Sequence, residues 1–182
     1  KNDNFADLLL EASPGVAVGE SSFVQGRLGL SRHQRLNSAW TLAGRVFLGL
    51  SGGDLPSNRR FDLGNANMLR GFAAGDVLSK DVLLGSAEIR GDVLRNFDFA
   101  FPWGLAFLSR LQLVTFVDAA LLSEDPDVFG SGDSAVDVGI GVRLHGRWFG
   151  IIPSMGTIDV GYPVDGDENG GVRIYLGLSQ AF

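Results

Sequence analysis

Cysteine is absent from the chain, and histidine occurs only twice, at His33 and His145. The missing thiols exclude disulfides, thiol catalysis and thiolate metal sites. No apolar run reaches the roughly 18 residues that a membrane-spanning helix requires, because Arg, Asp or Gly interrupts each long one. The formal charge of -6 also argues against nucleic acid as a partner, since binding a phosphate backbone takes clustered Lys and Arg.

Glycine is abundant instead, with 26 residues in 182, which argues against a mostly helical fold and favours a single all-β domain. Apolar and polar residues alternate with a period of two, most clearly from Phe107 to Leu122. One face of that run is apolar and the other carries Gln112 and Asp118. About ten such residues suffice for a tilted strand to cross a membrane in an antiparallel barrel.

The same alternation predicts about eight strands. They are Phe5 to Ala12, Val16 to Leu30, Ser38 to Leu50, Val82 to Asp92, Phe107 to Leu122, Val136 to Leu144, Met155 to Val164 and Val172 to Phe182. No helical pattern separates them, which argues against a parallel α/β fold. The stretch from Gly52 to Lys80 lacks a strand pattern, and a connection of that length is usually functional.

A short motif, Leu69-Arg70-Gly71-Phe72, lies in this long loop. Glu88 lies on the next predicted strand and Phe116-Val117-Asp118 on the one after, and the alternation places both acids on the inner face. Because the guanidinium fork donates to two carboxylates at once, we expect Arg70 to bridge the two strands. Gly71 then allows a close backbone approach, with Phe72 and Phe116 covering the ion pair.

In this order, the residues resemble the signature of the outer-membrane assembly-factor, or surface-antigen, superfamily. Its members include the barrel-assembly insertase BamA, the autotransporter-assembly factor TamA and the two-partner-secretion transporters. The resemblance covers most of the chain and implies an integral β-barrel of the bacterial outer membrane that inserts or translocates polypeptides. The implied partners are outer-membrane lipid and unfolded outer-membrane or secreted polypeptides. Neither catalysis nor a cofactor is expected.

The last predicted strand would lie at the closing seam of such a barrel. Its apolar face consists of Ile174, Leu176, Leu178 and Phe182, and it ends on an aromatic residue. We expect residues 1–182 to form a single barrel domain, without the periplasmic polypeptide-binding domains of the family.

The strand count resembles the C-terminal half of a sixteen-stranded barrel, with three strands before the arginine loop and five after it. An open half would leave unpaired edge groups in lipid, each costing several kcal/mol. A missing N-terminal half, self-closure or a second copy would close it. An eight-stranded barrel is too narrow to enclose the loop as well, so we expect a fragment or closure by a second copy. A closed eight-stranded monomer with an internal loop would contradict this expectation.

Two rival functions remain open at this stage: a passive pore or structural barrel, and a soluble β-sandwich or small ligand-binding barrel. Gly49 to Gly53 fits the G-x-S-x-G pattern of a catalytic serine, but no helical pattern follows and nothing marks either histidine as its base. Asp165 to Gly170 begins like a calcium loop, yet position twelve is Leu176, so a hairpin turn is favoured over a metal site.

Aromatic residues near strand ends are candidates for the girdles that mark the membrane interfaces. They are Trp40, Trp103, Trp148 and Tyr162.

Overall fold

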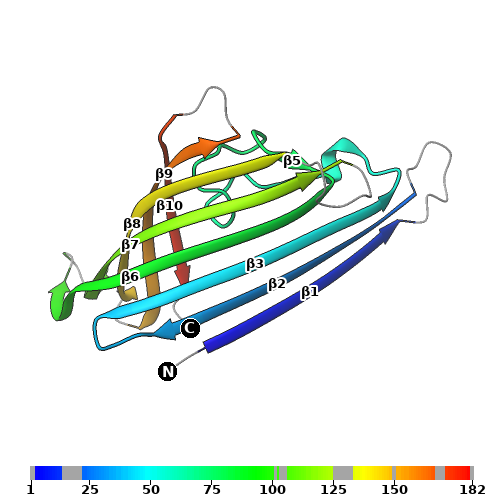
Figure 1. Ribbon diagram of the computed structural model, residues 1–182. Coiled ribbons are helices and arrows are strands. Elements are labelled where there is room, and N and C mark those ends of the chain that lie inside the picture. The colour runs from blue at the N-terminus through cyan, green and yellow to red at the C-terminus, as the bar shows by residue number, and fades with distance from the viewer. Residues whose placement is uncertain are drawn as a thin grey trace.

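The computed structural model describes residues 3–13, 22–100, 102, 106–124, 133–148, 151–166 and 171–180. Eight long strands form one antiparallel sheet in sequence order. They are β1 (Asp3–Ser13), β2 (Phe23–Arg35), β3 (Trp40–Gly53), β6 (Asp81–Ala100), β7 (Ala106–Ser123), β8 (Ser134–Trp148), β9 (Ile152–Asp165) and β10 (Arg173–Gln180). The sheet curls strongly, and β1 and β10 are its two edges (Figure 1). Within the described residues these edges are not paired with each other, so the sheet does not close on itself.

The prediction of an antiparallel all-β fold with about eight strands is confirmed, and the strand bounds differ most at the ends of the second and the fourth strand. For the second strand, predicted as Val16 to Leu30, the structure has β2 continuing to Arg35, while residues 16–21 lie outside the described part. The polar run from Arg32 to Arg35 hides the apolar period, but its backbone still pairs with β1 and β3. The fourth strand continues past Asp92 to Ala100. The sequence pattern ended too early because bulges beyond Asp92 break the period of two.

The long loop from Asp54 to Lys80 is not structureless. It contains a 3-10 turn, Ser57–Arg59, and two short strands, β4 (Phe61–Asp62) and β5 (Leu78–Ser79), which pair with each other. Other connections are tight: at residues 36–39 the Asn37 side chain accepts hydrogen bonds from the backbone N–H groups of Ala39 and Trp40. In the part of the chain that is described, no helix has the length and apolar character needed to cross a membrane.

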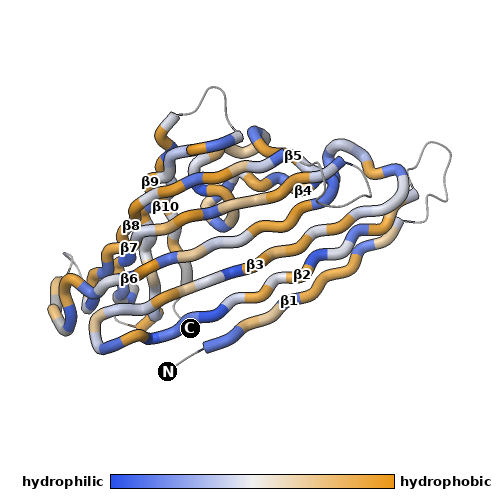
Figure 2. The backbone as a smooth tube through the Cα atoms, in the orientation of Figure 1, coloured by the Kyte–Doolittle hydropathy of each residue, from blue (hydrophilic) through white to orange (hydrophobic). Residues whose placement is uncertain are grey.

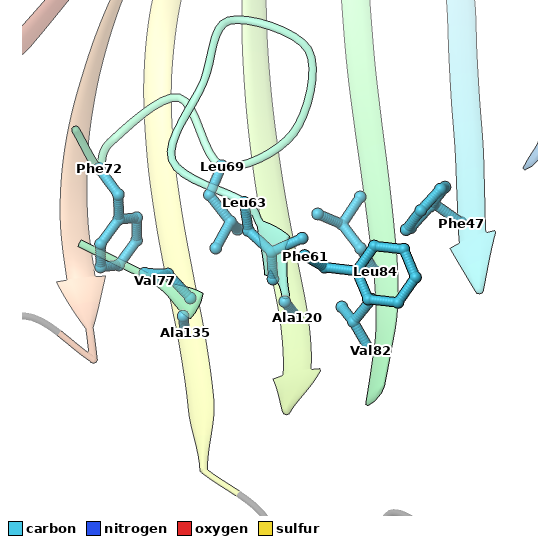
Figure 3. Close-up of a cluster of buried hydrophobic side chains, with 10 residues drawn as sticks. All are labelled: Phe47, Phe61, Leu63, Leu69, Phe72, Val77, Val82, Leu84, Ala120 and Ala135. Carbon is cyan, nitrogen blue, oxygen red and sulfur yellow. The ribbon is translucent and has the colours of Figure 1, made fainter. Parts of the chain in front are cut away.

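The two faces of the sheet differ, as the alternating colours along each strand show (Figure 2). Large apolar side chains are exposed on the outer face, for example Ile140 at 63% and Leu176 at 76%. On the inner face the loop packs against β3, β6, β7 and β8, and a buried apolar cluster fills the space between them (Figure 3). The cluster consists of Phe47, Phe61, Leu63, Leu69, Phe72, Val77, Val82, Leu84, Ala120 and Ala135.

This cluster corrects one expectation. By the alternation from Val82 to Asp92, the residues Ser86, Glu88, Arg90 and Asp92 share one face, which predicts a polar inner face for the fourth strand. At the end of β6 nearest the loop, however, the inward residues are Val82 and Leu84, and both are fully buried. The inner face is therefore apolar where the loop covers it and charged farther along the strand.

Candidate functional site: the arginine loop and its strand partners

Arg70 leaves the loop and points at the inner face of β6 and β7. Its Nε lies 2.8 Å from Asp118 Oδ2 and its Nη2 lies 2.9 Å from Asp118 Oδ1, which makes the pairing bidentate. Its Nη1 donates to Glu88 Oε1, and its Nη2 also reaches Ser86 Oγ at 3.3 Å. Arg70 is 4% exposed and Asp118 is fully buried, so little water competes for these hydrogen bonds.

The charge state of Arg70 follows from these neighbours. Burial by itself would lower the pKa of the guanidinium. The hydrogen bonds and negative charges of Asp118 and Glu88 outweigh burial and raise the pKa above the ordinary arginine value. The arginine is therefore permanently charged, and the site keeps its pairing at any pH at which the two acids are ionised.

Phe116 lies beneath the ion pair and covers one side of it. The Arg70 Cζ atom is 3.5 Å from the centroid of the Phe116 ring, a cation–π arrangement. The ring extends from β7 over Gly139 of β8, and a Cβ atom at Gly139 would overlap both the Phe116 ring and the Val160 carbonyl. Glycine at position 139 thus leaves the space in which the ring lies under the guanidinium.

Gly71 meets a third acid. Asp118 and Asp137 are directly opposite each other on β7 and β8, an arrangement that is unfavourable for like charges unless both are satisfied. The backbone N–H of Gly71 donates to Asp137 Oδ2 at 2.9 Å, while Arg70 neutralises Asp118. A Cβ atom at Gly71 would lie 2.8 Å from the backbone nitrogen of Pro163, so only glycine fits there without a shift of β9.

Phe72 has a different position from the one expected. It does not cover the ion pair but is fully buried in the apolar cluster with Leu63, Leu69 and Val77. Its carbonyl accepts a hydrogen bond from the Tyr175 hydroxyl of β10. The motif therefore contacts β6, β7 and β8 through Arg70 and Gly71, and the last strand through Phe72.

Glu88 is shared among three arginines. Besides Arg70, Arg90 Nε donates to Glu88 Oε2 at 2.7 Å and Arg143 Nη2 lies 3.6 Å from Oε1. Arg143 also donates to Asp159 on β9. These pairs extend the network across four neighbouring strands, and Arg70, Glu88, Arg90, Arg143 and Asp159 line a cavity of about 470 Å³.

Four of the motif and tether residues predicted from the sequence, Arg70, Glu88, Phe116 and Asp118, are in mutual contact or share a partner. Leu69 and Phe72 lie in the adjoining apolar cluster. The sequence reasoning missed Ser86, Asp137, Arg143, Asp159 and Tyr175. Ser86, Asp137 and Arg143 carry a usable signal, because the alternation from Val82 to Asp92 and from Val136 to Leu144 places them on the inner face.

The seam residues of the last strand lie apart from this site. Ile174, Leu176 and Leu178 are 66%, 76% and 65% exposed, and Phe182 lies outside the described residues. Of the girdle candidates, Trp103 is also outside, and Tyr162 is 52% exposed.

The described residues hold no group of His, Asp or Glu suited to a metal ion. Ser51, the serine of the G-x-S-x-G match, lies within β3, where its hydroxyl accepts a hydrogen bond from Gln25 at 3.1 Å.

A curled antiparallel sheet with an apolar outer face, and with a long loop bound to its charged inner face, is the wall of an outer-membrane type of barrel. The model of the Omp85 superfamily domain matches residues 4–182, so the chain belongs to the Omp85 superfamily. No curated protein matches the chain. Proteins of this family are β-barrels of the bacterial outer membrane in a superfamily of insertases and transporters, not enzymes, and membership implies membrane lipid and client polypeptides as partners.

Proposed function

We propose that the loop from Asp54 to Lys80 is an internal brace of the barrel, tethered by Arg70 to Glu88 and Asp118, and that the barrel so ordered inserts or translocates polypeptides. The observation that carries the proposal is the burial of one arginine between acids on two adjacent strands. Ordering a loop costs backbone entropy of roughly 1 to 2 kcal/mol per residue. A bidentate, dry ion pair and an apolar underside supply compensating interactions.

In this proposal clients meet the barrel at β10. Within the described residues β10 pairs with β9 alone, so its other edge presents free backbone N–H and C=O groups. Such an edge is a template to which an extended client strand adds. The outward side chains Ile174, Leu176 and Leu178 would form the lipid side of that seam.

Closure of the barrel belongs to the same proposal. Among the described residues the sheet is open, with the loop on its concave side, which supports closure by further strands or by a second copy. Native mass spectrometry in detergent distinguishes them: a complex of two 19.4 kDa chains supports the second copy. A monomer that resists unfolding as a closed eight-stranded barrel would contradict both.

The test is the substitution Arg70→Ala. It leaves buried Asp118 and partly buried Glu88 without their main partner, and we expect a loss of about 3 to 5 kcal/mol in the free energy of unfolding. Heat-modifiability on a detergent gel and urea unfolding in lipid vesicles measure the stability, and assembly of an outer-membrane client in the same vesicles measures the function. Arg70→Lys should restore part of the stability, since a single ammonium cannot pair bidentately.

The matched control is Arg60→Ala in the same loop. Arg60 pairs with Glu124 at 2.8 Å, but both side chains are substantially exposed, so we expect a change of at most about 1 kcal/mol. Equal effects at positions 60 and 70 would contradict the tether. Intact client assembly by a destabilised Arg70→Ala barrel would contradict the link from brace to function.

A passive pore is the second candidate, favoured by the polar cavity beside Arg70, which is lined by Arg45, Arg90 and Arg143 among others. Ion conductance across a bilayer without any client assembly would support the pore. The soluble alternatives are excluded by membership in the family.

A further inference from the structure

A groove of about 790 Å³ crosses the outer face of the sheet, on the side opposite the arginine loop. Two cross-strand rows form its floor. In one row Gly44 pairs with Ala87, and in the other Gly85 pairs with Ala119. These small residues make the wall thin between larger apolar neighbours such as Val46, which is 48% exposed.

Packing within the protein does not require the two glycines. A Cβ atom at Gly85 would meet no atom within 4 Å, and one at Gly44 would meet only the Ser86 carbonyl oxygen at 3.8 Å. By contrast, a Cβ at Gly71 or Gly139 on the inner face would overlap neighbouring atoms. The glycines of the groove therefore leave open volume on the side that faces lipid.

Arg32 lies at one end of this groove. Its neighbours Ser31 and His33 line the inner cavity, whereas Arg32 is exposed and lines the outer groove, opposite Gly44 in the sheet register. Among the described residues no hydrogen bond or ion pair is formed by the Arg32 side chain. A charge on the lipid-facing side of a barrel is unfavourable unless it reaches the membrane interface or meets a counter-charge there.

The membrane interface is close to Arg32. β2 and β3 are joined by the tight turn at residues 36–39, and short turns of outer-membrane barrels lie on the periplasmic side. Trp40, the first residue of β3, is 49% exposed and its ring lies over Gly91 on the same outer face, as expected of an interfacial aromatic residue. Arg32 lies near the end of β2 that leads into this turn, so its long side chain extends along the wall toward the lipid headgroups.

We propose that this groove binds one phospholipid of the periplasmic leaflet, with its phosphate paired to Arg32 and one acyl chain lying on the floor of Gly44, Gly85, Ala87 and Ala119. The guanidinium fork matches a phosphate bidentately. A second copy of the chain fits less well as the occupant. If two copies packed groove against groove, the partner's groove would offer no carboxylate to Arg32, because none lines it. The proposal does not depend on the tether of Arg70, because the two sites are on opposite faces.

The test uses the full chain in detergent with equimolar phosphatidylglycerol and diacylglycerol of identical chains, and counts the lipids retained in native mass spectrometry. We expect wild type to retain phosphatidylglycerol in preference to diacylglycerol, and Arg32→Gln to lower that retention about tenfold, with partial recovery in Arg32→Lys. Gly85→Leu fills the groove and should reduce retention similarly. Thr115→Leu is the control, because it adds the same side chain on the outer face of β7 outside the groove.

Heat-modifiability on a gel verifies that each variant is folded. Should Gly85→Leu fail to fold, Arg32→Gln still decides, because an exposed side chain without protein partners is not needed for folding. Unchanged retention in Arg32→Gln, or equal retention of the two lipids by wild type, overturns the proposal. Loss of a two-chain complex in Gly85→Leu with lipid retention intact would show that a second copy occupies the groove, and overturns it as well.

Discussion

Two regions of the inner face of the sheet can be compared: the part of β6 under the loop, and β1. The same strand alternation produces both, but only the first is covered by the loop. Under the loop, Val82 and Leu84 of β6 are fully buried. On β1, Leu9 is on the same inner face, because the cross-strand pairing leads from Leu9 through Arg27 and Gly49 to Val82. Leu9 is nevertheless 44% exposed. Alternation thus assigns a side chain to a face, whereas burial depends on whether another part of the protein lies over that face.

Charged side chains lie directly beside this covered apolar region. Arg70 pairs with Asp118, and the Gly71 N–H donates to one oxygen of Asp137, immediately beside the apolar cluster. The loop that these contacts hold therefore also protects them from water. At β1 the loop forms the exposed ion pair of Arg59 with Glu11, at 3.1 Å, but among the described residues no side chain of β1 belongs to the buried apolar cluster. The apolar residues on the inner face of β1 are exposed in this open sheet, and they would contact the segment that completes the barrel.

We expect the largest loss of stability from a change at Phe72, which packs the loop onto the covered region. Phe72→Ala removes a fully buried ring from the cluster between loop and sheet, and we expect a loss of about 3 to 5 kcal/mol in the free energy of unfolding. Urea unfolding in lipid vesicles, followed by tryptophan fluorescence, measures it. A loss below about 1 kcal/mol would mean that the loop is not packed on the sheet in the membrane.

A matched pair compares the two regions directly. Leu84→Ala should cost about 2 to 5 kcal/mol in the same assay, because it opens a cavity under the loop. Leu9→Ala, the same change on the same face, should cost less than about 0.5 kcal/mol if β1 is uncovered. Equal losses would show that closure of the barrel buries the inner face of β1, and the oligomeric state of Leu9→Ala would then tell whether a second copy does so.

The smallest effect concerns the link between the loop and the last strand. Tyr175→Phe deletes only the hydroxyl that donates to the Phe72 carbonyl, and we expect a loss of about 0.5 to 1.5 kcal/mol. Hydrogen exchange of the β10 amides should increase as well, because the edge strand is attached to the loop at that point. Tyr162→Phe on the exposed outer face is the control, and exchange that rises equally in both variants would contradict the role of the link.

Much of the fold was predictable because its signal is local. A period of two assigned the strands and their faces from Phe107 to Leu122, and it put Glu88 and Asp118 on the inner face. The bounds of β2 and β6 were wrong where a polar run or bulges interrupt that period. The contacts of Tyr175 with Phe72 and of Arg143 with Glu88 join residues far apart in the sequence, and no local pattern indicates them.

The sequence by itself determined the class of fold, the family signature and the inward direction of the acids, since each follows from residue type and spacing along one strand. Only the tertiary structure decided that the loop has an apolar underside on Val82 and Leu84, that Phe72 belongs to this core, and that the Gly71 N–H donates to Asp137. The physical reason is that burial and pairing depend on which segments pack together, and the return path of a long loop across four strands is not encoded in the period of any of them.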